Sequence, residues 1–119
     1  MERKQRLAAR VGVFGIGLAT YWPQFPGLRE RLVGYQRAVE AHLAELGADV
    51  ISAGFVDTPE AGREAGERFA RENLDLLICS IGTYATSSQV LPVVQRQHAS
   101  VLILNLQPVA ALDYEHTDT

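Results

Sequence analysis

The side chains best suited to recognition gather in residues 17–27. Tyr21, Trp22 and Phe25 lie within five residues of one another, with Gln24 among them. Aromatic rings beside an amide suit stacking on a sugar or contact with another protein. They equally suit a loop that folds back as a small hydrophobic cluster over the edge of its own domain. The residues alone leave both interpretations open.

The groups that most often bind metals or act as nucleophiles show no catalytic arrangement. His42, His98 and His116 form no pair with metal-ligand spacing, so we predict no metal site in this chain. Cys79 lies inside an apolar run and is predicted to be structural rather than a reactive thiol.

Hydroxyl side chains cluster in a second polar segment, residues 82–88. Thr83, Thr86, Ser87 and Ser88 have no base close to them in the sequence. We therefore expect them to cap a helix or to form hydrogen bonds, with Ser87 or Ser88 as the helix cap. No catalytic residue is predicted in this chain.

A glycine-rich stretch, residues 15–20, approaches a dinucleotide-binding fingerprint but lacks its context. The fingerprint needs a helix to begin at its last small residue, whereas Pro23 and Pro26 delay the next helix to about Leu28. The acidic residue expected at the end of the second strand is also missing. The acidic residues of a phosphorelay receiver and the hydroxyl-rich phosphate loop of a flavodoxin are not present either. The glycines are therefore expected to serve a turn and close packing.

The elements that position these residues alternate along the chain. The predicted strands are residues 11–16, 48–53, 75–81 and 100–104. The predicted helices are residues 28–46, 58–73 and 89–98. Strands that alternate with helices imply parallel pairing through right-handed crossovers. We expect one doubly wound α/β domain at residues 11–119, with strand order 2-1-3-4, after an N-terminal arm at residues 1–10.

The topology predicts where a ligand would bind. Open parallel sheets bind ligands beyond the carboxyl ends of their strands, near the point where the strand order reverses. Four loops lie there: residues 17–27, 54–58, 82–88, and 105 onward. The first and third of these loops follow neighbouring strands and carry most of the unusual side chains.

Composition narrows the class of protein. The chain has 119 residues, of which 47% are hydrophobic and 21% charged, which suits one packed core. The formal net charge of −3 does not favour a nucleic-acid or anionic-membrane partner. A single cysteine and no long apolar run predict a cytoplasmic protein.

Three stretches carry a family resemblance. The longest is GIGLATYWPQFPGL at residues 15–28, followed by Arg31-Leu32; the shorter two are IGTYA at residues 81–85 and LNLQP at residues 104–108. Together they resemble the N-terminal region of L-arabinose and L-fucose isomerase-like proteins, over nearly the whole chain past Arg10.

The resemblance implies the N-terminal domain of a longer aldose–ketose isomerase. In that family this domain is flavodoxin-like, and its loops help to close the active site of a neighbouring subunit in a homo-oligomer. The enzymes use a divalent metal, usually manganese, held by later domains that this sequence does not contain. The chain alone is then expected to have no metal, no cofactor and no activity, and to meet a sugar only together with those domains.

The resemblance also implies substrate-contacting residues. The matching positions are Thr20 and Tyr21 in the first loop, Thr83 and Tyr84 in the third, and Gln107 after the fourth strand. Two alternatives stay open beside this reading: a stand-alone module that binds a sugar or another small molecule, and a protein-interaction module of the same fold.

Overall fold

A computed structural model describes residues 8–83, 85–95 and 97–105. The strands are β1 (Arg10–Ile16), β2 (Asp49–Val56), β3 (Leu76–Ile81) and β4 (Ser100–Leu104). The helices are α2 (Leu28–Glu45), α3 (Pro59–Arg71) and α4 (Ser87–Val94), with a short 3-10 helix, η1, at Ala19–Tyr21. All pairings are parallel, in the order β2-β1-β3-β4. The predicted doubly wound α/β fold and strand order are confirmed, and they are those of a flavodoxin-like domain.

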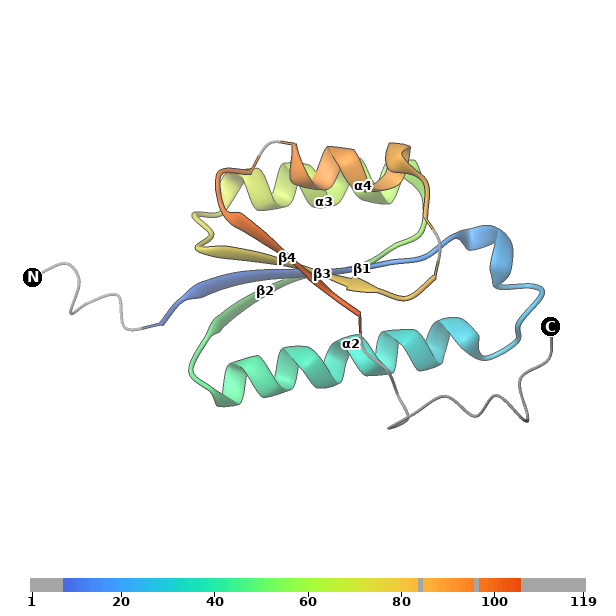
Figure 1. The fold of residues 1–119 in the computed structure, drawn as a ribbon, viewed down its shortest axis with the longest axis horizontal. Coiled ribbons are helices and arrows are strands. Elements are labelled where there is room, and N and C mark those ends of the chain that lie inside the picture. The colour runs from blue at the N-terminus through green and yellow to red at the C-terminus, as the bar shows by residue number, and fades with distance from the viewer. Residues whose placement is uncertain (1–7, 84, 96, 106–119) are drawn as a thin grey trace, which may run out of the picture.

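The domain has three layers. Figure 1 shows the sheet between α3 and α4 on one face and α2 on the other. No helix among the described residues is long and apolar enough to cross a membrane.

Local sequence explains where two of the helices begin and end. The Thr58 hydroxyl accepts a hydrogen bond from the N–H of Ala61, and Pro59 occupies the first position of α3, as predicted. Helix α2 starts after Gly27 and ends before Gly47, whose φ angles of 82° and 100° favour glycine.

Two elements, β2 and α4, differ from the prediction by more than two residues at one end. Strand β2 runs to Val56 instead of residue 53, because one extra residue near Gly54 (φ 73°) forms a bulge against β1 and lets pairing resume at Phe55. Helix α4 spans residues 87–94 instead of 89–98.

The start of α4 has a different cap from the one expected. Thr86 is the capping residue, not Ser87 or Ser88, and its N–H donates to Oε1 of Gln89 at 3.0 Å. Pro92 lies in the second turn of α4, where it removes one backbone donor. The helix ends two residues later, at Val94.

The two faces of the sheet carry cores of different size. The larger core lies under α3 and α4 and consists of Phe14, Val56, Ala65, Phe69, Leu77, Cys79 and Val93. On the α2 face only Val11, Val13 and Ile78 are fully buried. The larger core therefore carries most of the hydrophobic stabilisation.

Helices α3 and α4 touch through backbone atoms. A Cβ atom built on Gly62 would lie 2.1 Å from the carbonyl oxygen of Gln89, and one on Gly66 would lie 2.1 Å from that of Pro92. Both glycines are buried. The close contact between the two helices is possible only because glycine has no side chain at these two positions.

We predict that Gly62→Ala lowers the free energy of unfolding by about 1–3 kcal/mol, because the added methyl group forces the two helices apart. The matched control is Gly34→Ala in α2, where a Cβ meets nothing within 4 Å. Since alanine is the better helix former, the control should gain up to about 1 kcal/mol. Urea unfolding measures both, and equal effects of the two substitutions would show that α3 and α4 do not pack this closely.

Candidate functional site

The aromatic loop, residues 17–27, folds back toward the end of β2. The indole N–H of Trp22 donates to Oδ2 of Asp57 at 2.9 Å, and the indole ring lies 5.7 Å from the ring of Phe55. Arg29 also donates to Oδ2 of Asp57, at 3.2 Å, while its guanidinium lies 5.8 Å from the Phe55 ring. Trp22 therefore belongs to a small cluster on its own domain.

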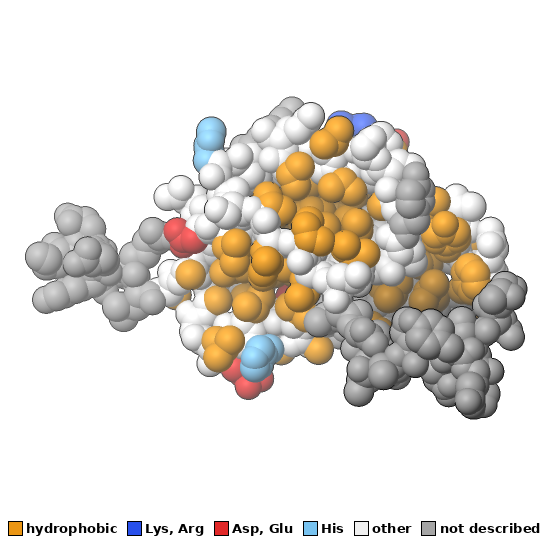
Figure 2. Space-filling view, in the orientation of Figure 1, with side chains coloured by type: hydrophobic (Ala, Val, Ile, Leu, Met, Phe, Trp, Pro, Cys, Tyr) orange, Lys and Arg blue, Asp and Glu red, His pale blue; other side chains and the backbone are white. Residues whose placement is uncertain are grey.

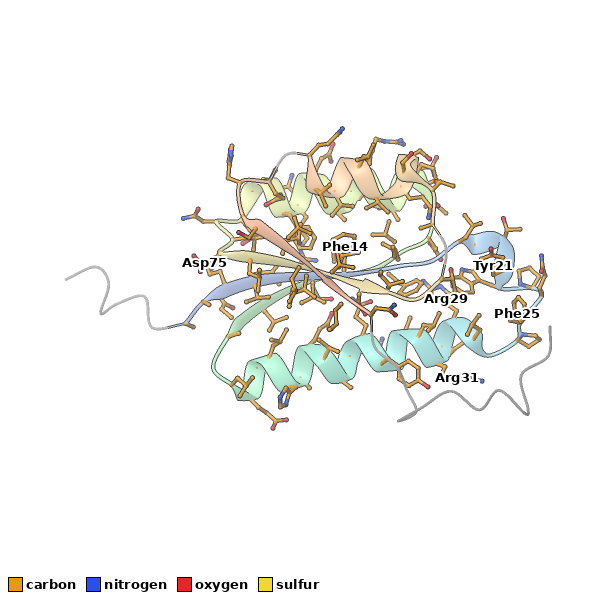
Figure 3. The ribbon with its side chains drawn as sticks, in the orientation of Figure 1. Phe14, Tyr21, Phe25, Arg29, Arg31 and Asp75 are labelled. Carbon is orange, nitrogen blue, oxygen red and sulfur yellow. The ribbon has the colours of Figure 1, made fainter. Side chains whose placement is uncertain are left out.

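The outer part of the loop faces solvent. Phe25 is 51% exposed and lies edge-on to the half-buried Tyr21, with ring centroids 6.2 Å apart. Figure 3 shows Tyr21 and Phe25 at the same end of the molecule as Arg29 and Arg31. The loop thus combines both interpretations: Trp22 packs inward, and Phe25 presents an apolar surface.

The first and third loops are joined where the sheet order reverses. The N–H of Leu18 donates to the Thr83 hydroxyl at 3.0 Å. Nε2 of Gln89, a residue only 1% exposed, donates to the carbonyl of Gly17 at 2.8 Å. The N–H groups of Gly82 and Thr83 both donate to the carbonyl of Ile16. These bonds hold the two loops together at the carboxyl ends of β1 and β3.

A pocket of about 230 Å³ lies beside this junction, between α2 and the ends of β3 and β4. Its lining consists of Leu28, Arg31, Leu32, Tyr35, Ser80, Ile81, Gly82 and Asn105. The lining thus combines charged and polar side chains with apolar ones. This edge-pocket, defined by these residues, lies where doubly wound folds bind ligands.

The edge-pocket residues differ from those predicted. Thr20 is exposed on η1, and Tyr21 is half-buried beside it. Thr83 holds the neighbouring loop in place. Tyr84 and Gln107 lie outside the described residues. The predicted substrate contacts of all five residues stay predictions.

Arg31, Tyr35, Ser80 and Asn105 were missed as candidate site residues. Ser80 and Asn105 stand at the carboxyl ends of adjacent strands, which is a signal that the topology rule could have used. Arg31 and Tyr35 line the pocket because of the direction in which α2 crosses the sheet. Helical periodicity in the sequence does not predict that direction.

Two observations concern the titratable groups of the described residues. No three His, Cys, Asp or Glu side chains there come together as a metal site. Burial raises the pKa of the Cys79 thiol to about 11, so this group is protonated at neutral pH. The lining of the edge-pocket offers a ligand charged, hydroxyl and amide groups.

Comparison with known proteins gives no relative from which a role could be transferred. No protein-family model matches this chain, and no curated protein matches it either.

We predict that Trp22→Ala lowers the free energy of unfolding by about 2 kcal/mol or more, because the change removes the contact with Phe55 and one donor to Asp57. Phe25→Ala is the control: its side chain is half exposed, so its loss should cost less than about 1 kcal/mol. Urea unfolding combined with light scattering measures stability and association together. If both substitutions lower the free energy of unfolding only slightly, and Trp22→Ala changes the oligomeric state, Trp22 would instead belong to a contact surface.

Proposed function

We propose that this domain forms part of the sugar pocket, and a subunit contact, of a metal-dependent aldose–ketose isomerase of the L-arabinose or L-fucose type. The observation that carries the proposal is the edge-pocket, which Arg31, Tyr35, Ser80 and Asn105 line together with apolar residues. The motifs at residues 15–28, 81–85 and 104–108 support the family. The single cysteine favours a reducing compartment, so the proposed location is the cytoplasm.

The size and chemistry of the edge-pocket suit a small hydroxylated ligand. Its volume of about 230 Å³ is below the range of about 300–1,000 Å³ that is usual for larger ligands. Arg31 supplies donors, Tyr35 and Ser80 supply hydroxyl groups, and Asn105 supplies an amide. Leu28 and Leu32 offer apolar surface for the carbon face of a sugar ring.

The chemical step needs groups beyond this pocket. Moving hydrogen between adjacent carbons requires a base or a polarising metal placed against the sugar. In the resembling enzymes that metal is manganese, and its ligands belong to later domains. The residues of this chain would hold and orient the sugar, with no direct part in the proton or hydride transfer.

A second candidate function is a stand-alone module that binds a small molecule or a protein. The exposure of Phe25 beside Tyr21 favours a protein contact at the aromatic loop. Tight binding of a sugar by the chain alone would favour the small-molecule module, since the isomerase proposal makes the edge-pocket only part of the complete site.

We expect weak sugar binding by this chain alone, with a dissociation constant of about 1 mM or higher. Titration of L-arabinose and L-fucose should shift the amide NMR signals of Gly82 and Asn105. Asn105→Ala should weaken binding about tenfold, because one hydrogen-bonding group is lost. The control, Asn73→Ala, changes an exposed amide near the amino end of β3 and should leave binding unchanged. Unshifted signals at saturating sugar would refute the sugar pocket.

We also expect no ketose from either sugar when this chain is supplied with manganese, and no micromolar binding of manganese in calorimetry. The physical reason is the predicted lack of ligand spacing among its histidines and carboxylates. A ketose assay with an intact isomerase as the positive control makes the measurement. Turnover by this chain alone would contradict the assignment of catalysis to other domains.

A further inference from the structure

The edge-pocket carries a positive charge that its described lining does not balance. Arg31 is the charged residue of that lining, which includes no Asp or Glu among the described residues. A guanidinium group stays protonated at neutral pH. Within the part of the chain that the structure describes, the Arg31 side chain makes no ion pair or hydrogen bond. Its charge is therefore available to a ligand.

The carboxylates near the start of α2 do not balance this charge. Arg29, two residues earlier, is paired with Asp57 at 3.2 Å, and the same carboxylate oxygen accepts the indole N–H of Trp22. Glu30 is exposed and does not line the pocket. The two neighbouring arginines of this helix thus differ, because Arg29 has a counter-ion and Arg31 has none among the described residues.

Two other small pockets of the domain are balanced in charge. The pocket between α3 and α4 is lined by both Arg63 and Glu67, and the pocket beside β2 by both Glu64 and Arg68. In each of them an arginine side chain has a glutamate in the same lining. The edge-pocket departs from this pattern, although the formal net charge of the whole chain is −3.

Ser80 gives a second and independent sign of a polar ligand. The residue lines the edge-pocket and is only 9% exposed. Its hydroxyl has no hydrogen-bond partner within the described residues. A buried hydroxyl without a partner costs free energy, which a hydroxyl group of a ligand would recover by forming a hydrogen bond.

The larger hollow next to the edge-pocket has a different character. It measures about 480 Å³ and is lined by apolar residues, Tyr35 and His42, with no Asp, Glu, Lys or Arg among its described residues. Figure 2 shows hydrophobic side chains gathered across the middle of the view, where Figure 1 places β4 in front. An anionic ligand would find no counter-charge there, so the edge-pocket is the better match for it.

We propose that the edge-pocket receives an acidic sugar, which carries a carboxylate or a phosphate group. Arg31 is exposed as well as lining the pocket, so its guanidinium lies at the rim and binds the anionic group there. Ser80, on the buried side, forms a hydrogen bond with a sugar hydroxyl. This inference rests on the proposed function and narrows its substrate from neutral aldoses to acidic ones.

The chemistry of isomerisation fixes where the anionic group belongs. Conversion of an aldose to a ketose moves hydrogen between the first two carbons, which must face the groups that other domains supply. The anionic group that Arg31 binds is therefore at the opposite end of the sugar, on the last carbon. The ligand class is a uronate or a terminal sugar phosphate.

Three sugars that differ only at the last carbon provide the first test. D-Galactose, D-galacturonate and D-galactose 6-phosphate are titrated into the chain, and the amide NMR signals of Gly82 and Asn105 report binding. At least one of the two acidic sugars should have a dissociation constant about tenfold lower than that of D-galactose, because a charge-assisted hydrogen bond is added. The sugar that binds more tightly identifies the anionic group.

Two arginines of α2 provide the second test. Arg31→Gln removes the charge from the pocket, whereas Arg37→Gln removes one from an exposed position outside it. Both variants change the net charge equally, and glutamine is a good helix former. Arg31→Gln should raise the dissociation constant of the acidic sugar about tenfold, to that of D-galactose. Arg37→Gln should raise it less than about twofold, because an exposed charge outside the pocket is screened by salt.

Ser80→Ala separates the hydroxyl contact from the charge. This variant should weaken the binding of D-galactose and of the acidic sugar by the same factor, about threefold, because the Ser80 hydroxyl bonds a group that both ligands share. A loss confined to the acidic sugar would place the anionic group against Ser80 instead of Arg31 and would overturn the arrangement.

Three other outcomes would also overturn the proposal. Equal affinity for D-galactose and both acidic sugars would mean that the charge of Arg31 is already balanced, and it would leave the neutral sugar pocket standing. Equal weakening by Arg31→Gln and Arg37→Gln would show attraction by net charge alone. Inorganic phosphate that binds as tightly as D-galactose 6-phosphate would show an anion site without sugar recognition. Unshifted signals with every sugar would refute the sugar pocket itself, together with this inference.

Discussion

The packing around the carboxyl end of strand β1 depends on two glycines, Gly15 in the strand and Gly17 just after it. A Cβ atom on Gly15 would lie 2.3 Å from Oε1 of Gln36 and 2.6 Å from the Phe55 ring. A Cβ on Gly17 would lie 2.8 Å from the indole of Trp22. Because these glycines leave space, helix α2, the end of β2 and the aromatic loop all reach the same short length of β1. The shape of the candidate site follows from that convergence.

A partly buried polar network centred on Gln36 holds the same region. Nε2 of Gln36 donates to the carbonyl of Gly54 and to Oε2 of Glu40, and the Ser52 hydroxyl also donates to Glu40. Gln36 is only 3% exposed, so loss of these partners would leave a buried amide unsatisfied. The network is bonded to β2 at the bulge, through the carbonyl of Gly54. Because pairing with β1 resumes after the bulge, β2 continues to Phe55, whose ring contacts that of Trp22.

The sequence alone predicted the strands, their order and most helix limits, because continuous apolar runs and helical periodicity are local signals. It did not predict the bulge at Gly54 or the contact from Gln89 to Gly17, since each depends on atoms from distant segments. The same reason hid Arg31 as an edge-pocket residue, whereas Asn105 could have been found from its place directly after the fourth strand. The capping role of Thr86 was missed although its partner, Gln89, lies only three residues further along the chain. Thr83 follows the third strand, as predicted, and its hydroxyl accepts the bond from Leu18, while its predicted contact with a substrate stays a prediction.

The unequal pairing and burial of the strands have a consequence for how the domain unfolds. Strand β1 pairs on both sides and contributes Val13 and Phe14, both fully buried, whereas β4 pairs on one side and is half exposed. Partial unfolding should therefore begin at β4 and spread inward, leaving β1 until last. Amide protons of β4 would exchange with solvent through such local openings, while those of β1 would wait for the whole domain to unfold. Strand β4 thus forms the part of the sheet that opens first, and strand β1 forms the part that stays folded longest.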